Sequence, residues 1–328
     1  MKQRRQLRHL LLIIGLSVSF MSACGKPADS AAPKELAKVS QVTNWFAQPE
    51  HGGQYAALEK GFYKEAGLDM TILPGGPQVS AIQQVASGQV QFGMAQADEL
   101  LAAREEGIPV VAVAAIFQIN PQAIMFHAGE NISNAQDLSG RSLYIAPGAM
   151  YWEYMKKAYD LNDFEEVAFT GNYSGFLADQ KSAIQSYVTS DPYLLKQQNA
   201  EVSFLRIHDL GYQPYANVLF TTEKMISDEP GLVRSFVEAS IKGWEYYKTN
   251  YEEINPVIAK ANPDLTLESM KATAENEMEL IFGGDAEAGG AGTMTAERWT
   301  ALAGQLAEIG LIDNPDEANN AYTTEFLQ

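Results

Sequence analysis

The sequence predicts an α/β protein made of two successive blocks in which strands and helices alternate, followed by a helical tail. In the first block, segments of helical periodicity separate strand-like runs at 39–46, 68–76, 90–98 and 109–117. In the second block, 123–127 is strand-like and 134–148 contains a turn, a strand and a glycine-bearing end. A helical segment then separates this stretch from the strand-like run at 167–172. This alternation indicates parallel or mixed sheets that are covered by helices on both faces.

The last third of the chain has mainly helical periodicity. Regularly spaced apolar residues predict helices over 231–250, 254–261, 265–281 and 295–309, and the glycine-rich stretch at 286–295 predicts a flexible insertion. Ligands of open α/β sheets bind beyond the carboxyl ends of the strands. We therefore expect the functional residues in the loops that follow the predicted strands.

The first 23 residues have the pattern of an export signal. Four basic residues, Lys2, Arg4, Arg5 and Arg8, precede an apolar run at 10–21, and small residues follow it. The run is shorter than the roughly 20 apolar residues that span a bilayer. We therefore expect residues 1–23 to be a lipoprotein signal peptide that is removed, rather than a membrane helix.

The only cysteine, Cys24, follows "MSA", which is similar to a bacterial lipobox with Met21 in the place of the usual leucine. We expect an acylated Cys24 at the mature N-terminus and a flexible tether over 24–37. The protein would then lie in the cell envelope, facing the periplasm or on the outer face of the cytoplasmic membrane. The alternative is cleavage nearby, which would leave a soluble protein with a free thiol.

The chain is strongly acidic. Its formal net charge of −18 becomes −22 when the four positive charges of residues 1–23 are removed. A charge of this sign argues against binding to nucleic acid or to anionic membranes. With 46% hydrophobic residues, the roughly 300 remaining residues can form one large or two medium domains. We expect a monomer.

The sequence lacks the motifs of metal sites and of common catalytic sites. His51, His127 and His208 are far apart and have no metal-ligand spacing. There is also no phosphate-binding loop, no dinucleotide fingerprint and no nucleophile elbow. We therefore predict a protein that is not an enzyme and that has no catalytic residue, no metal and no cofactor.

The stretch at 44–56, "NWFAQPEHGGQYA", concentrates aromatic, acidic and imidazole side chains after the first predicted strand. Glu50 and His51 could form an acid/base pair, but adjacent residues of an extended segment point to opposite sides. Aromatic, amide and acidic side chains recur in the other strand-end loops, as a cleft for a flat ligand requires. The predicted ligand-binding residues are Trp45, Glu50, His51, Tyr55, Gly76, Gln96, Asp98, Gln118, Trp152, Tyr173, Asp191 and Tyr193.

These residues are expected to act in different ways. The stacking residues are Trp45, Tyr173 and Tyr193, the hydrogen-bonding residues are Glu50, Gln96, Asp98 and Asp191, and the orienting polar contact is His51. Three structural alternatives stay open. Trp45 could belong to the core, Gly76 could belong to a plain turn in "GGP" at 75–77, and Asp191, which precedes Pro192, could only initiate a turn.

Several segments resemble periplasmic solute-binding proteins of the thiamine-precursor, sulfonate, taurine and nitrate transport group. They are "NWFAQPEHGGQYAALEKGFYKEAGLDMTI", "GGPQVSAIQQVASGQVQFGMAQADELL", "VAVAAIFQ", "DLSGRSL" and "EPGLVRSFVEASIKGWEYY". The resemblance implies a bilobed type II periplasmic-binding fold with two hinge crossovers, near 118–121 and 219–221. Lobe 1 would hold 38–118 and 219–328, and lobe 2 would hold 119–218. The implied partners are a small-molecule solute, an ABC permease and its ATPase, with closure over the solute.

Within this group, the "PEHGG" loop is most similar to binders of thiamine pyrimidine precursors such as formylaminopyrimidine. The related pyrimidine synthase of thiamine biosynthesis has a cysteine-rich segment and a cofactor-holding lysine near the histidine, whereas this chain has only Cys24 and no lysine at 52–59. Riboflavin is an alternative solute. Alkanesulfonate, taurine and nitrate are further alternatives, although the predicted site loops contain no arginine or lysine to bind an oxyanion.

Overall fold

The computed structural model describes residues 35–327. The predicted signal peptide, Cys24 and the tether up to residue 34 lie outside this part of the chain. The predicted tether overlaps the fold at its end, because Ala37 is the first residue of a strand. Among residues 35–327, no helix combines the length and the apolar character that crossing a bilayer requires.

The first of two five-stranded sheets contains the N-terminal strands. In spatial order its strands are β2 (Leu68–Leu73), β1 (Ala37–Val42), β3 (Phe92–Ala95), β10 (Ala216–Thr222) and β4 (Val110–Phe117). β1 pairs in parallel with β2 and β3, whereas β10 is antiparallel to β3 and β4. All eight residues of β4 are buried, as its unbroken apolar sequence predicts for a strand covered on both faces.

The second sheet repeats this arrangement. In spatial order its strands are β7 (Phe164–Ala168), β6 (Arg141–Ile145), β8 (Ala183–Tyr187), β5 (Gln122–His127) and β9 (Val202–Arg206). β6 pairs in parallel with β7 and β8, and β5 is antiparallel to β8 and β9. The predicted α/β class is therefore confirmed.

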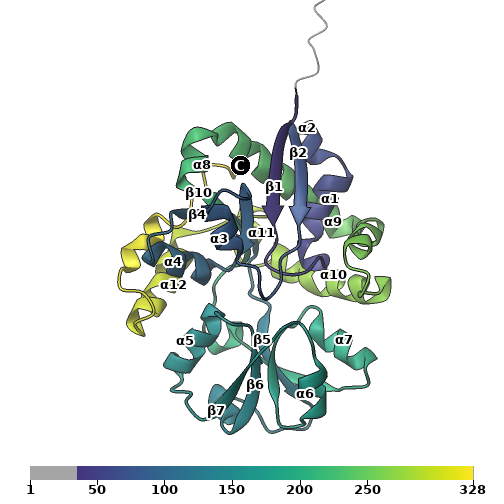
Figure 1. The fold of residues 1–328 in the computed structure, drawn as a ribbon, viewed down its shortest axis with the longest axis vertical. Coiled ribbons are helices and arrows are strands. Elements are labelled where there is room, and N and C mark those ends of the chain that lie inside the picture. Colours follow the sequence, from purple (N-terminus) through teal and green to yellow (C-terminus); the bar gives the residue numbers. More distant parts are fainter. Residues whose placement is uncertain (1–34, 328) are drawn as a thin grey trace, which may run out of the picture. The chain divides into compact units, whose positions relative to one another are not determined.

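Each sheet carries its own helices, so that residues 35–327 form two lobes (Figure 1). The helices of the first lobe are η1 (Pro49–His51), α1 (Gly52–Glu59), α2 (Phe62–Glu65), α3 (Ala81–Ala86), α4 (Ala97–Glu105), α8 (Glu223–Asp228), α9 (Pro230–Ala261), α10 (Leu267–Phe282), α11 (Ala286–Gly289), α12 (Ala296–Glu308) and η4 (Pro315–Asn319). Those of the second lobe are η2 (Ala135–Leu138), α5 (Met150–Ala158), α6 (Ser174–Ala178), α7 (Asp191–Gln197) and η3 (His208–Leu210).

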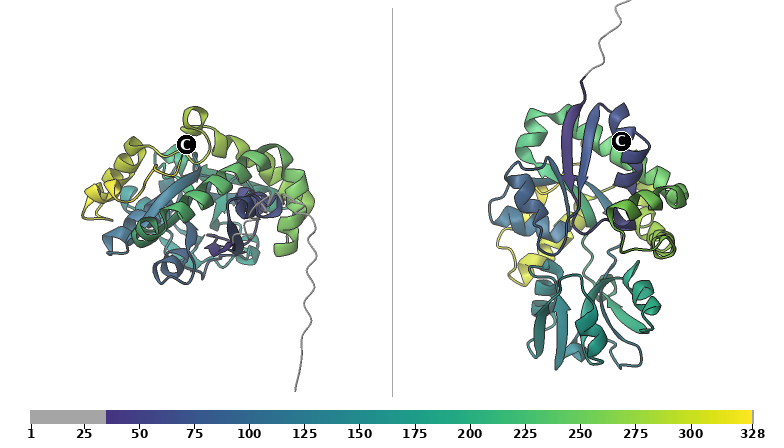
Figure 2. Two further views of the ribbon diagram at one scale, coloured as in Figure 1. Left: turned by 90° about the horizontal axis from the view of Figure 1, so that it is seen from above. Right: turned by 45° about the vertical axis from the view of Figure 1, so that its right-hand side comes forward.

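Two chain segments connect the lobes, as Figure 2 shows. The first runs from the end of β4 at Phe117 to the start of β5 at Gln122, and the second from the end of β9 at Arg206 to the start of β10 at Ala216. The second predicted crossover, at 219–221, and the predicted lobe boundary at 218/219 instead fall inside β10. The sequence did not show that β10 begins at Ala216, before the predicted crossover.

The helical tail differs from its prediction in one place. The predicted break between the helices at 231–250 and 254–261 is present as a kink inside α9, where the backbone of Asn250 is non-helical (φ −126°, ψ 24°). The glycine-rich stretch at 286–295 is bonded to the first sheet rather than separate from it, because Gly292 O accepts a hydrogen bond from Ala115 N of β4 at 2.9 Å.

Helices α1 and α9 pack unusually closely in the first lobe because glycines face each other at their contact. A Cβ atom on Gly53 would lie 2.2 Å from Trp244 Cγ, and a Cβ on Gly243 would lie 2.1 Å from Gly53 O. Neither position has room for alanine. This contact fixes α1, and with it the loop that precedes α1, against the long helix of the tail.

We predict that Gly53→Ala lowers the free energy of unfolding by about 2 kcal/mol or more, because the new methyl group overpacks the contact with Trp244. The matched control is Gly304→Ala in the middle of α12, where nothing lies within 4 Å of the new Cβ. This change should raise the free energy of unfolding by about 0.5–1 kcal/mol. Urea unfolding of both variants measures the difference, and equal stabilities would contradict the close packing.

Candidate functional site

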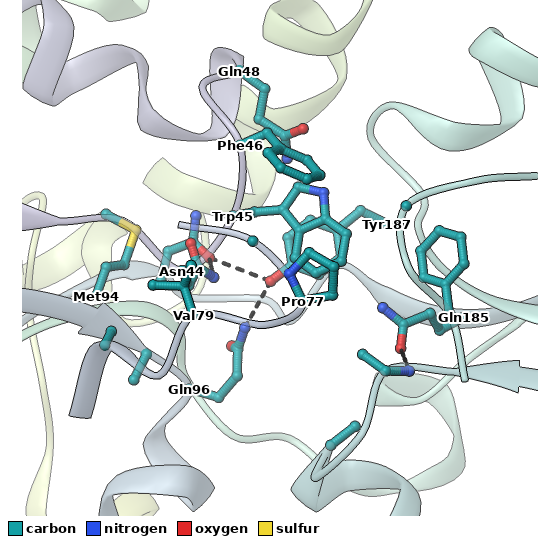
Figure 3. A pocket seen from close by; sticks show the side chains of 18 of the residues that line it. Asn44, Trp45, Phe46, Gln48, Pro77, Val79, Met94, Gln96, Gln185 and Tyr187 are labelled. Carbon is teal, nitrogen blue, oxygen red and sulfur yellow. Dashed lines mark hydrogen bonds between the residues drawn. The ribbon is translucent and has the colours of Figure 1, made fainter. Parts of the chain in front are cut away.

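A cavity of about 1010 Å³ lies between the two lobes. From the first lobe it is lined by parts of 44–51, 74–83 and 94–108, and from the second lobe by parts of 146–151, 169–173 and 185–198. These segments follow the carboxyl ends of β1, β2, β3, β6, β7 and β8, the location that the sheet topology predicts for a ligand. Figure 3 shows side chains from both lobes that face this cavity.

An aromatic wall crosses the cleft. Trp45 of the first lobe stacks on Phe169 of the second, with ring centroids 6.1 Å apart and an interplanar angle of 15°. Phe169 in turn contacts Tyr173, at 5.5 Å between centroids. Phe46 packs edge-on against Trp45 at 5.6 Å. Large, rigid rings of this kind supply the apolar faces on which a flat ligand stacks.

Phe46 is 42% exposed and lies between glycines of opposite lobes. A Cβ on Gly76 would be 3.0 Å from the Phe46 ring, and a Cβ on Gly171 would be 3.1 Å from it. Both glycines also have positive φ, 153° and 89°, which side chains rarely adopt. Phe46 therefore contacts both lobes at the exposed edge of the aromatic wall.

Two hydrogen bonds to its backbone carbonyl hold Trp45 in place. Gly75 N donates to Trp45 O at 3.0 Å, and Thr43 Oγ1 donates to the same oxygen at 2.7 Å. A Cβ on Gly75 would lie 2.0 Å from Thr43 O, so that only glycine permits this approach. The turn at 75–77 ("GGP") therefore positions Trp45. The Gly75 N–H donates to Trp45 O and is not free to bind a ligand.

A chain of neutral polar groups forms another side of the site (Figure 3). Gln96 Nε2 donates to Tyr187 Oη at 2.7 Å, and Tyr187 Oη donates to Asn217 Oδ1 at 3.3 Å. Asn44 Nδ2 donates to the same Asn217 oxygen at 2.9 Å. This leaves Asn44 Oδ1 to accept from His51 Nε2 at 3.0 Å. Burial lowers the pKa of His51 to about 3, so that its imidazole is neutral.

Asn217 holds this network in position. It is fully buried in β10 and has a left-handed backbone conformation with φ 48°, which asparagine tolerates better than most residues. Its Nδ2 donates to Glu50 O at 2.9 Å. One amide therefore connects the first-lobe residues Asn44 and Glu50 with Tyr187 of the second lobe.

Six of the predicted ligand-binding residues line the cavity: Trp45, His51, Gly76, Gln96, Tyr173 and Asp191. Both carboxylate oxygens of Asp191 already accept hydrogen bonds, from Tyr173 Oη at 2.7 Å and from Tyr187 N at 2.8 Å. Asp191 therefore fixes the ring of Tyr173, and it is also the first residue of α7.

The other six predicted residues do not line the cavity: Glu50, Tyr55, Asp98, Gln118, Trp152 and Tyr193. Four of their side chains, including that of Glu50, bond elsewhere. Asp98 Oδ2 accepts from Tyr212 Oη at 2.8 Å, Gln118 Nε2 donates to Ala115 O at 2.8 Å and Thr293 O at 3.0 Å, and Trp152 Nε1 donates to Glu166 Oε2 at 2.9 Å. Tyr55 is buried in the core of the first lobe, and Tyr193 is partly exposed.

Glu50 lies behind the cavity as a contact between the lobes. Thr189 Oγ1 of the second lobe donates to Glu50 Oε1 at 2.8 Å. Glu50 Oε2 is buried and has no hydrogen-bond partner among the described residues. Burial raises the pKa of Glu50 to about 7, although the hydrogen bond from Thr189 opposes this effect.

The sequence interpretation missed several residues that line the cavity: Asn44, Phe46, Glu99, Tyr151, Gln185, Tyr187 and Asn217. Glu99 and Tyr151 each stand next to a residue that was predicted, on a helix where adjacent side chains point about 100° apart. Among residues 35–327, no group of three or more histidine, cysteine, aspartate or glutamate side chains is arranged to hold a metal ion.

Comparison with solved structures shows the fold. The alkanesulfonate-binding protein SsuA of Xanthomonas axonopodis superimposes with a TM-score of 0.66 at 13% identity, covering 88% of this chain and 99% of the other. The nitrate-binding protein NrtA of Synechocystis superimposes with a TM-score of 0.68 at 12% identity, covering 89% and 87%. The predicted bilobed type II periplasmic-binding fold is therefore confirmed.

The family follows from the sequence. A family model described as NMT1/THI5 like matches residues 48–254, and the chain belongs to this family. Similar sequences include the formylaminopyrimidine-binding protein of Halalkalibacterium halodurans, 22% identical over 94% of this chain and 96% of that protein. The riboflavin-binding protein RibY of Chloroflexus aurantiacus is 25% identical over 98% of each. A 4-amino-5-hydroxymethyl-2-methylpyrimidine phosphate synthase of Legionella pneumophila is 24% identical over 70% of this chain and 75% of the enzyme.

Glu50 makes the stability of the fold depend on pH. Its pKa of about 7 in the folded chain exceeds the ordinary value of 4.5, so that the folded chain binds more protons than the unfolded chain between these pH values. The stability associated with this group is present below pH 4.5 and is lost as the pH rises through about 7.

We predict that Glu50→Gln, which keeps an acceptor for Thr189, increases the free energy of unfolding at pH 8 and has little effect at pH 4.5. The gain at pH 8 is on the order of 3 kcal/mol, at about 1.4 kcal/mol per pKa unit. Glu50→Ala, which removes the acceptor and leaves a cavity, should destabilise the fold at pH 4.5. This loss should be smaller at pH 8, because the variant also lacks the buried carboxylate that destabilises the wild type there. Urea unfolding at the two pH values checks this, and parallel pH profiles for Glu50→Gln and the wild type would contradict it.

Proposed function

We propose that the chain is the solute-binding protein of an ABC importer and that it captures a small, nitrogen-containing aromatic solute between its lobes. The observation that carries the proposal is the composition of the cavity. Trp45, Phe169 and Tyr173 provide ring faces, and no lysine or arginine is present among the described residues that line it. A neutral or weakly cationic heterocycle fits these surroundings, with ring nitrogens and amino groups that bond to amides and hydroxyls.

The same composition argues against an oxyanion as the solute. A sulfonate or nitrate group needs cationic donors or several converging N–H and O–H donors to replace its hydration. The side chain of His51 is neutral and its Nε2–H is directed to Asn44. The carboxylates of Glu99, Glu106 and Asp191 line the cavity and would repel an anion.

The enzymatic alternative has little support in the cavity. A nucleophile or general base needs a partner that activates it within hydrogen-bond reach, and the nearest candidate, His51, bonds to an asparagine. The chain also lacks a lysine at 52–59 and any cysteine after Cys24. We propose a binding protein rather than a synthase.

The proposal includes the place of action. Export through the signal at 1–23 and acylation of Cys24 would tether the protein beside its permease on the outer side of the cytoplasmic membrane. The lobes would close over the solute and present the complex to the permease, with the ATPase on the other side of the membrane. The names of the similar proteins favour two solutes, a formylaminopyrimidine and riboflavin.

Thermal denaturation of the purified chain with a panel of solutes tests the function. The panel contains formylaminopyrimidine, hydroxymethylpyrimidine, riboflavin, taurine, an alkanesulfonate and nitrate. A ligand at a hundred times its Kd stabilises the folded state by about 2.7 kcal/mol. We expect stabilisation by an aromatic heterocycle and none by the anions, whereas stabilisation by an anion alone would contradict the proposal.

We predict that Trp45→Ala weakens binding of the stabilising heterocycle about tenfold or more, because one stacking face and its buried area are lost. Isothermal titration calorimetry measures the change. Trp45→Phe, which keeps a ring, should retain part of the affinity. Trp152→Phe is the control outside the cavity and should leave Kd within about twofold; a normal Kd for Trp45→Ala would remove Trp45 from the site.

A further inference from the structure

The cavity extends beyond the aromatic wall along helix α4. It is lined there by Glu99, Ala102, Ala103 and Glu106. Their spacing of i, i+3, i+4 and i+7 places them on one face of α4 and its C-cap residue Glu106. The two alanines leave this face open, while a carboxylate stands at each end. A volume of about 1010 Å³ is at the upper end of the roughly 300–1,000 Å³ that holds drug-sized ligands.

The carboxylate of Glu99 stands at the inner end of this groove. Glu99 is half-buried, and only its Oε2 is engaged by the backbone, through a hydrogen bond from Gln96 N at 3.0 Å. Burial and the neighbouring Asp98 carboxylate raise the pKa of Glu99 to about 7. A donor that reaches this carboxylate would stabilise its charged form.

The second lobe contributes a hydroxyl to the lining of the same cavity. Tyr151 of α5 lines the cavity and is 3% exposed. Its Oη has no hydrogen-bond partner among the described residues. A buried polar group without a partner costs free energy, which a ligand can recover by bonding to it. At the outer end, Glu106 is exposed, so that the groove opens toward solvent.

We infer that this groove, defined by Glu99, Ala102, Glu106 and Tyr151, is a second subsite that binds a hydroxyl- or amine-bearing tail of the solute. The inference rests on the proposed function, because the ring of the same solute would stack on Trp45. It narrows the solute to a flat heterocycle with a substituent that donates hydrogen bonds. Ala102 is the residue whose small size permits the tail, and Glu99 is the residue that recognises it.

Two pairs of probes test the inference by calorimetry with the whole chain. Riboflavin is compared with lumiflavin, which has the same ring system without the hydroxylated chain. Hydroxymethylpyrimidine is compared with its methyl analogue, which lacks the hydroxyl group. In at least one pair the tailed compound should bind ten times more tightly than its partner. Equal or weaker binding of the tailed compound in both pairs would overturn the inference, although ring binding would leave the proposed function intact.

Variants of groove residues test whether the preference for the compound with a tail arises in this groove. Ala102→Leu should abolish the preference by filling the groove, so that the two compounds of a pair bind with similar Kd values. Ala102→Ser, which adds little volume, is the matched control and should keep the preference. Glu99→Gln should reduce the preference, measured as the ratio of the two Kd values in a pair, at least threefold.

An unchanged preference in both Ala102→Leu and Glu99→Gln would overturn the assignment to this groove. If no probe binds the wild type, the proposed function fails and the inference fails with it. Circular dichroism and the melting temperature without ligand show whether each variant folds.

Discussion

The buried amide of Asn217 is the interaction on which the geometry of the cavity depends. Its oxygen accepts hydrogen bonds from Asn44 of the first lobe and Tyr187 of the second, and its nitrogen donates to the backbone of Glu50. Because β10 directly follows the second connection between the lobes, Asn217 stands where the chain returns to the first sheet. A shift of this strand would move the aromatic loop and the polar network together.

Burial explains why the hydrogen-bonded network around Asn217 consists of neutral groups. Buried ionised groups are costly unless they are paired, and the network uses amides, a phenol and a neutral imidazole instead. The carboxyl groups near it, Glu50 and Asp191, have pKa values raised by burial to about 7 and about 6. Their hydrogen bonds to Thr189 and Tyr173 serve the contact between lobes and the orientation of the aromatic wall.

The sequence predicts the class of fold well because periodicity reports which face of each element is buried. The same periodicity shows where the strands end, and therefore which loops can reach a ligand. Trp45, Gln96 and Tyr173 of these loops line the cavity. The sequence cannot show which of two adjacent residues in the first turn of a helix faces the cavity. Asp98 turns to Tyr212 while Glu99 faces the cavity, and Trp152 turns to Glu166 while Tyr151 faces it. These choices depend on how α4 and α5 pack, and Asn217 has no local signal at all within an apolar strand.

A crystal structure of the chain with the heterocycle that stabilises it most tests the central claim most directly. We predict a closed cleft in which the ring lies parallel to the indole of Trp45 and bonds to groups of the network around Asn217. The tail would extend toward Glu99. A ligand bound away from Trp45, or an anion bound in the cleft in place of the heterocycle, would contradict the account.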